Sequence, residues 1–185
     1  MKRITDVRRA SAAGAGLVFV ATVALSAAGC GGGRSPQQGT VADLRVTGNA
    51  PAVDGREQIV AANNNGVFQV AFDVPTEFSQ NATVMVADRA DHGSERREEK
   101  IIDVRCNGDT PCTFNVRADC RFTPDNRIQC SSIDEGDGPV DEDLPVADLT
   151  PLMTGNSTDL YVILEVRPNA IDAVEQAVPV TLRYQ

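Results

Sequence analysis

Val67-Phe68-Gln69-Val70-Ala71-Phe72-Asp73-Val74 is the stretch from which the fold of this chain can be inferred. Large apolar residues recur at every second position, while Gln69 and Asp73 fall on the intervening positions. Successive side chains of a β-strand point to opposite faces of a sheet. The stretch therefore predicts a half-buried antiparallel strand with one face on a core and one in solvent.

The residues around this strand predict further short strands and tight turns. Asn63-Asn64-Asn65-Gly66 separates the strand from the apolar run 59–62, and Asn-Gly between apolar runs predicts a β-hairpin because both residues tolerate positive φ. Similar runs predict strands over 41–47, 82–86, 101–106, 112–123, 127–133 and 160–166. The run 160–166 is apolar almost throughout, as expected of a central strand buried on both faces.

The C-terminal segment carries two different patterns. Ala170 to Ala177, with Asn169 as a cap, predicts two helical turns. Val178, Val180, Leu182 and Tyr184 then alternate as a closing strand, in which Pro179 favours an edge position.

Together these patterns predict an all-β protein, an antiparallel β-sandwich of about nine short strands over residues 41–185. The arrangement resembles bacterial immunoglobulin-like or fibronectin-like domains, mainly over residues 41–87 and 160–184. Because such scaffolds carry many unrelated functions, the resemblance does not define an activity.

Four cysteines lie within 25 residues of sequence, at positions 106, 112, 120 and 130. If 124–126 is a three-residue hairpin loop, Cys120 lies directly opposite Cys130, and the same counting around 107–111 sets Cys106 opposite Cys112. Opposed residues are close enough for a disulfide, so we expect Cys106–Cys112 and Cys120–Cys130. Zinc binding is the alternative, but the cysteines lack the short paired spacing of structural zinc sites.

The N-terminus has the layout of a secretory signal peptide. Basic residues (Lys2, Arg3, Arg8 and Arg9) precede an apolar run, residues 17–25, and small residues that end at Gly29-Cys30. The small residues before a cysteine resemble the lipobox of bacterial lipoproteins. That resemblance implies that residues 1–29 are removed and that Cys30 is lipidated, with 30–40 as a flexible tether. A secreted protein without lipid and a retained N-terminal anchor are the alternatives.

The same resemblance predicts the location. We expect attachment to the cell envelope through lipidated Cys30. The site would be the outer membrane if the host has two membranes, because Gly31 rather than Asp follows the cysteine, and otherwise the outer face of the cytoplasmic membrane. The net formal charge of −9 argues against nucleic acid as a partner, because phosphate backbones repel an acidic chain.

Two polar segments are the candidate sites. Residues 134–143 are rich in carboxylates, and Asp134, Asp137, Asp141 and Asp143 are candidate calcium ligands, with a solvated acidic loop as the alternative. Residues 88–100 carry both charge signs and predict a solvated loop, with a protein-docking patch as the alternative. This segment holds His92, the only histidine, to which we assign no catalytic or metal role because no orienting partner is evident in the sequence.

These observations favour a non-enzymatic binding or assembly module with an envelope protein as its partner and no cofactor. A calcium-dependent adhesion or ligand-binding domain is the alternative. An envelope hydrolase is less favoured, since the sequence has no Gly-x-Ser-x-Gly motif, no zinc-ligand helix motif and no phosphate-binding loop.

Overall fold

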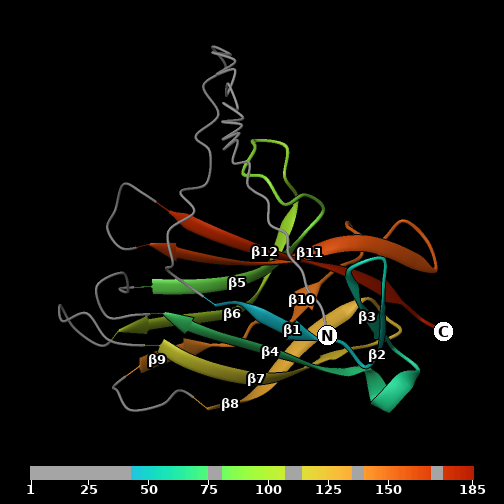
Figure 1. Ribbon diagram of the computed structural model, residues 1–185, viewed down its shortest axis with the longest axis horizontal. Helices are drawn as coiled ribbons and strands as arrows, with labels where there is room; N and C mark the ends of the chain where they lie inside the picture. The colour runs from blue at the N-terminus through green and yellow to red at the C-terminus, as the bar shows by residue number, and fades with distance from the viewer. Residues whose placement is uncertain (1–42, 75–80, 107–113, 135–139, 168–172) are drawn as a thin grey trace, which may run out of the picture. The chain divides into compact units, whose positions relative to one another are not determined.

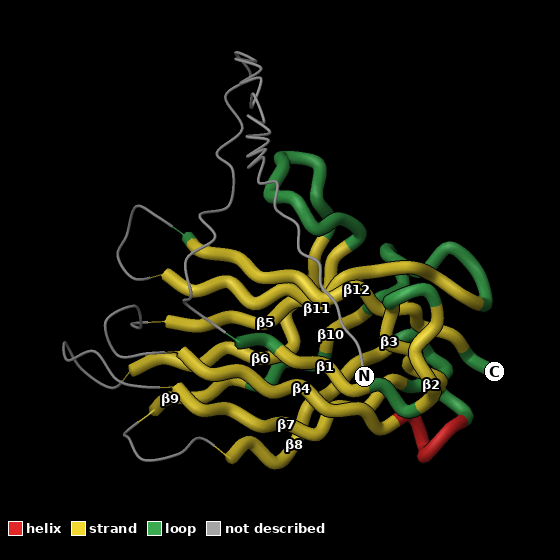
Figure 2. The backbone as a smooth tube through the Cα atoms, viewed as in Figure 1, coloured by secondary structure: helices red, strands yellow, loops and turns green. Residues whose placement is uncertain are grey.

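The computed structural model describes residues 43–74, 81–106, 114–134, 140–167 and 173–185, and these residues form an all-β structure of two sheets (Figures 1 and 2). The smaller sheet has the strand order β1 (Arg45–Thr47), β4 (Val67–Val74), β7 (Phe114–Phe122), β8 (Arg127–Asp134), β10 (Ala147–Asp148). The larger sheet has the order β2 (Ala50–Val53), β3 (Arg56–Val60), β12 (Val174–Arg183), β11 (Ser157–Arg167), β5 (Asn81–Ala87), β6 (Glu98–Cys106), β9 (Val140–Asp143). The predicted all-β class is confirmed.

The two sheets share one hydrophobic core. Alternate residues of β4 (Phe68, Val70, Phe72) and of β11 (Leu160, Val162) belong to the same buried cluster, although the two strands lie in different sheets. This is the two-layer arrangement in which each sheet buries one face against the other. The solvent-facing positions predicted for β4 are also found, since Gln69 is exposed and Asp73 is half-buried.

The run 160–166 occupies the centre of the larger sheet, as predicted. β11 pairs with β12 on one side and with β5 on the other. Ile163 is fully buried although it points away from the main core, where it forms a small second cluster with Met85 and Ala87. The larger sheet is therefore covered on part of its outer face.

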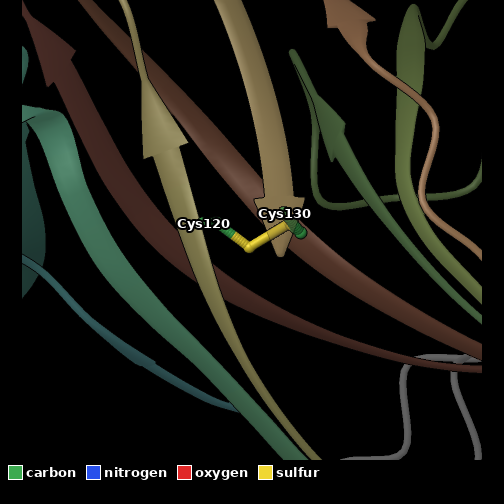
Figure 3. The surroundings of a disulfide bond; sticks show 2 residues. All are labelled: Cys120 and Cys130. Atoms are coloured by element: carbon green, nitrogen blue, oxygen red, sulfur yellow. A yellow bond between two sulfur atoms is a disulfide. The ribbon is translucent and has the colours of Figure 1, made fainter. Parts of the chain in front are cut away.

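The register predicted for the hairpin of β7 and β8 is also correct. Phe122 lies opposite Ile128 and Cys120 opposite Cys130. The two cysteines form a disulfide with a Cα–Cα distance of 3.9 Å, and both are buried in the shared core (Figure 3). The disulfide therefore joins β7, the middle strand of the smaller sheet, covalently to its neighbour β8.

The hairpin predicted across residues 63–66 is wrong, although the turn exists. The 3-10 turn η1 (Asn63–Gly66) has positive φ at Asn64 (45°), Asn65 (54°) and Gly66 (77°), as the residue types indicate. It joins β3 in the larger sheet to β4 in the smaller sheet, because β3 pairs with β2 and β12 while β4 pairs with β1 and β7. The turn thus crosses between the layers.

The hairpin used to align Cys106 with Cys112 is likewise not formed. β6 lies in the larger sheet between β5 and β9, and Cys106 lies opposite Val140. Both edges of β6 are thus occupied, and β7 belongs to the other sheet. Cys106 is disulfide-bonded, but Cys112 lies outside the described residues, so the Cys106–Cys112 bond stays a prediction.

The C-terminal helix prediction is wrong for residues 174–177, which begin strand β12. Ten consecutive residue pairs with β11 outweigh the weak local helical pattern. The edge position is also wrong, since β12 lies between β11 and β3. Pro179 directly precedes Val180, the first residue paired with β3, and this β3–β12 pairing is parallel in an otherwise antiparallel architecture.

Candidate functional site

The segment between β5 and β6, residues 88–97, lies on the face of the larger sheet that points away from β4, β7 and β8 (Figures 1 and 2). We call this segment the strap. Most of its residues are exposed, as the sequence predicts, but the Arg96 side chain is only 2% exposed. The strap is therefore attached to the sheet through a buried guanidinium group.

Arg96 is held by two carboxylates. Its Nη1 and Nη2 donate to the two carboxylate oxygens of Glu175 at 2.9 and 2.8 Å, and its Nε donates to Glu98 at 2.6 Å. Paired hydrogen bonds between a guanidinium and a carboxylate are among the strongest polar contacts in proteins. The contact joins the strap to β12, 79 residues further along the chain.

The Arg96–Glu175 contact shifts the protonation equilibria of both groups. The hydrogen bond with Glu175 raises the pKa of Arg96, against the opposing effect of burial. Burial alone would raise the pKa of Glu175, but hydrogen bonds and charge from Arg96, with a contribution from His92, outweigh it and hold the pKa below its usual value of 4.5. Both groups are therefore charged at neutral pH.

A row of four acidic residues and one threonine crosses five strands of the sheet, and its Glu175 end lies beneath the strap. Glu175 of β12 lies opposite Glu165 of β11, which in turn lies opposite Thr83 of β5. The row continues from Thr83 to Asp103 of β6 and then to Asp143 of β9. Like charges directly opposite each other destabilise a sheet, so this row needs cations near it.

Three arginines provide those cations. Besides Arg96, Arg167 donates through Nε to Glu165, and Arg105 donates to Asp103 at 2.7 Å. Asp103 also accepts a hydrogen bond from the hydroxyl of Thr83 at 3.1 Å. The acidic row is thus a compensated polar network on the outer face of the larger sheet.

An apolar patch lies next to the row and under the strap. Ile163, Met85 and Ala87 are buried there, with Tyr161 and Ala177 partly buried against them. The Nη2 of Arg96 lies 3.7 Å from the sulfur of Met85, so the arginine covers part of this patch. Its burial therefore combines packing with ion pairing.

His92 also points toward the acidic row. Its Nδ1 lies 3.2 Å from Oε1 of Glu175, so the histidine does have an orienting partner, contrary to the sequence interpretation. One ligand atom each from His92, Glu165 and Glu175 lies within 4.8 Å of the other two. Among the described residues, this is the group of histidine, cysteine and acidic side chains that could hold a metal ion.

The predicted calcium ligands occupy different places. Asp134 ends β8 in the smaller sheet, whereas Asp141 and Asp143 are exposed residues of β9 at the edge of the larger sheet. Asp137, like Cys30 and Cys112, lies outside the described residues. Calcium binding at these aspartates stays a prediction, as does the lipidation of Cys30.

The strap site could not be recognised from sequence spacing. His92 and Arg96 lie 83 and 79 residues from Glu175, and Glu175 falls in a stretch with a helical pattern. The available signal was the composition of the strap, in which both charge signs alternate around one histidine.

Comparison with protein-family models, curated proteins and solved structures finds no match for this chain. Within the described residues, no helix has both the length and the apolar character needed to cross a membrane.

Proposed function

We propose that the protein is a lipid-anchored extracytoplasmic protein whose β-domain is a non-enzymatic binding or assembly module of the cell envelope. The observation that carries the proposal is the Cys120–Cys130 disulfide in the buried core. Disulfides persist in oxidising compartments, to which a signal peptide over residues 1–29 would send the chain. Cys30 would then be the point of lipid attachment and residues 30–40 the tether.

The immunoglobulin-like nature of the domain is part of this proposal. It is supported by two sheets packed on one core, with antiparallel pairing between most neighbours. Immunoglobulin domains have about seven to nine strands. The four shortest strands, β1, β2, β9 and β10, all lie at sheet edges, so the longer strands alone form a sandwich closer to that size.

The surface chemistry supports recognition of a polar protein surface. Val53 and Val146 are the large hydrophobic residues with high exposure among the described residues, at 51% each. The outer face of the larger sheet instead presents charged groups, including Arg105 and Arg167, each 61% exposed. A partner would therefore contact this face mainly through ion pairs and hydrogen bonds.

Cross-linking on intact cells tests both parts of the proposal. We expect the native protein to fractionate with membranes and to cross-link to a reproducible envelope protein, identified by mass spectrometry. A Cys30→Ala variant should leave the membrane fraction and lose that partner, whereas a Ser35→Ala control in the same tether should behave as the native protein.

Two results would contradict the proposal. Membrane attachment that persists in Cys30→Ala would exclude the lipid anchor at this residue. A native protein that yields no reproducible cross-linked partner would exclude the assembly role.

A further inference from the structure

We propose that His92, Glu165 and Glu175 form a zinc-binding site between the strap and the outer face of the larger sheet. The site lies within the β-domain itself and does not depend on lipid anchoring or on an envelope partner.

The positions of the donor atoms fit a small divalent cation. Zinc binds histidine nitrogen and carboxylate oxygen at about 2.0–2.2 Å, which places neighbouring ligand atoms of a tetrahedral site about 3.3 Å apart. Nδ1 of His92 and Oε1 of Glu175 are already 3.2 Å apart, and one ligand atom each of His92, Glu165 and Glu175 lies within 4.8 Å of the other two. A small side-chain adjustment would bring all three to bonding distance and leave a fourth position open.

The kinds of donor atom favour zinc over calcium. Calcium takes six to eight oxygen ligands, usually from carboxylates, carbonyls and water. One imidazole and two carboxylates are instead a set that suits zinc and similar transition ions. The proposed site is thus chemically distinct from the calcium site predicted at Asp134, Asp137, Asp141 and Asp143.

The charged side chains around the site carry a net negative charge that a bound cation would offset. Three carboxylates, Glu98, Glu165 and Glu175, face two guanidinium groups, Arg96 and Arg167. Arg167 also lies within electrostatic reach of Glu98 and Glu175, so these groups act as one cluster. These five side chains together carry one more negative than positive charge.

Arg96 competes with the proposed ion for Glu175, as Arg167 does for Glu165. The Nη2 of Arg96 donates to Oε1 of Glu175 at 2.8 Å, the same oxygen that faces His92. Zinc must therefore take this oxygen from Arg96, which can keep its hydrogen bond with Glu98. The competition predicts that removal of the guanidinium charge strengthens zinc binding.

Two of the three proposed ligands lie on paired β-strands, and the third lies on the strap. Glu165 and Glu175 lie opposite each other on neighbouring interior strands, and Glu165 is only 6% exposed. His92 lies on the strap and its side chain is 73% exposed. Zinc would therefore fasten the strap to the sheet, and removal of His92 should harm the fold little.

Zinc titration of the full-length protein, purified in detergent and freed of metal with a chelator, tests the site by calorimetry and by thermal unfolding. We expect one zinc ion to bind per chain with a rise in Tm. Because His92 is the only histidine in the chain, His92→Ala should weaken binding by about tenfold or more. The control Asp141→Asn, on exposed β9, should bind zinc as the native protein does.

Arg96→Gln supplies a result that a purely structural cluster would not produce. We expect it to bind zinc more tightly than the native chain does, provided that it retains the native circular-dichroism spectrum. If Arg96→Gln does not fold, the comparison of native protein with His92→Ala decides the question alone. No saturable zinc binding, or equal affinity in His92→Ala, would overturn the proposal.

Discussion

Arg96 is the residue whose loss should affect the domain most among the polar side chains of the strap. Arg96→Ala leaves Glu175, whose side chain is 13% exposed, without its guanidinium partner. Breaking a buried ion pair costs about 3–5 kcal/mol, and we expect about 3 kcal/mol here because Glu175 keeps some contact with water. Urea denaturation at pH 7 with a chelator present measures the change in the free energy of unfolding. The double variant Arg96→Ala, Glu175→Gln should be more stable than Arg96→Ala alone, because it carries no lone buried carboxylate.

The same pair predicts a pH dependence of stability. The pKa of Glu175 is lower in the folded chain than its usual value of 4.5, so the folded state favours the ionised form. The stabilisation by Glu175 is therefore fully present above about pH 4.5 and is lost as the pH falls through the folded-state pKa. The stability difference between native protein and Glu175→Gln should be largest at pH 7 and should shrink at pH 3. A difference that is constant between these pH values would contradict the role of the ion pair.

At the scale of single residues, a contact could be predicted from the sequence only where its two residues lie close together in the chain. Cys120 and Cys130 are separated by 10 residues, and counting across one turn found their bond. Arg96 and Glu175 are 79 residues apart, and nothing in the local sequence of either residue indicates the other. Arg96 is buried against Glu175 of β12 and Met85 of β5, contacts between strands that periodicity alone does not reveal.

At the scale of elements, the turn η1 provides a test of how the chain passes between the sheets. Gly66 has φ +77°, and a Cβ at this position would lie 1.9 Å from the carbonyl oxygen of Phe122. Gly55 has nearly the same φ, +75°, but no atom within 4 Å of the added Cβ. Gly55→Ala should therefore cost about 1 kcal/mol of backbone strain, whereas Gly66→Ala should cost about 3 kcal/mol or more because β4 and β7 must also move. Equal losses of stability in thermal or urea unfolding would show that the close approach to Phe122 is unimportant.

The strands themselves were predictable, but of their partners only the β7–β8 pairing was predicted correctly. Alternation identified β4 and β5, because burial of every second side chain imposes that pattern on the sequence, and a nearly continuous apolar run identified β11. Alternation says which face is buried but not which strand lies alongside, so the segment after Asn64-Asn65-Gly66 was paired with the wrong neighbour. The segment 174–177 was predicted as helix rather than strand for a related reason. The ten residue pairs between β12 and β11 determine its conformation, and the local sequence does not show them.

At the scale of the whole molecule, the strands at the sheet edges are short or polar. β1 and β10 have three and two residues, β2 contains Pro51, and β9 carries Asp141, Glu142 and Asp143. Such edges oppose the addition of a strand from another chain. The proposed partner is therefore expected to contact the outer face of the larger sheet rather than to extend a sheet.

The proposed attachment point and the described strands lie in different segments of the chain. All described strands lie within the unit Ser35–Gln185, whereas the proposed lipidation site, Cys30, precedes it. Cys30→Ala should therefore change the location of the protein but not the stability of its β-domain. We expect this variant to be found in the soluble extracytoplasmic fraction, with a Tm within about 1 °C of the native value in the same detergent, because exposed substitutions outside a fold change stability little. A large fall in Tm would mean that Cys30 takes part in the folded domain, for instance through a disulfide with Cys106, and would contradict both its lipidation and the predicted Cys106–Cys112 bond.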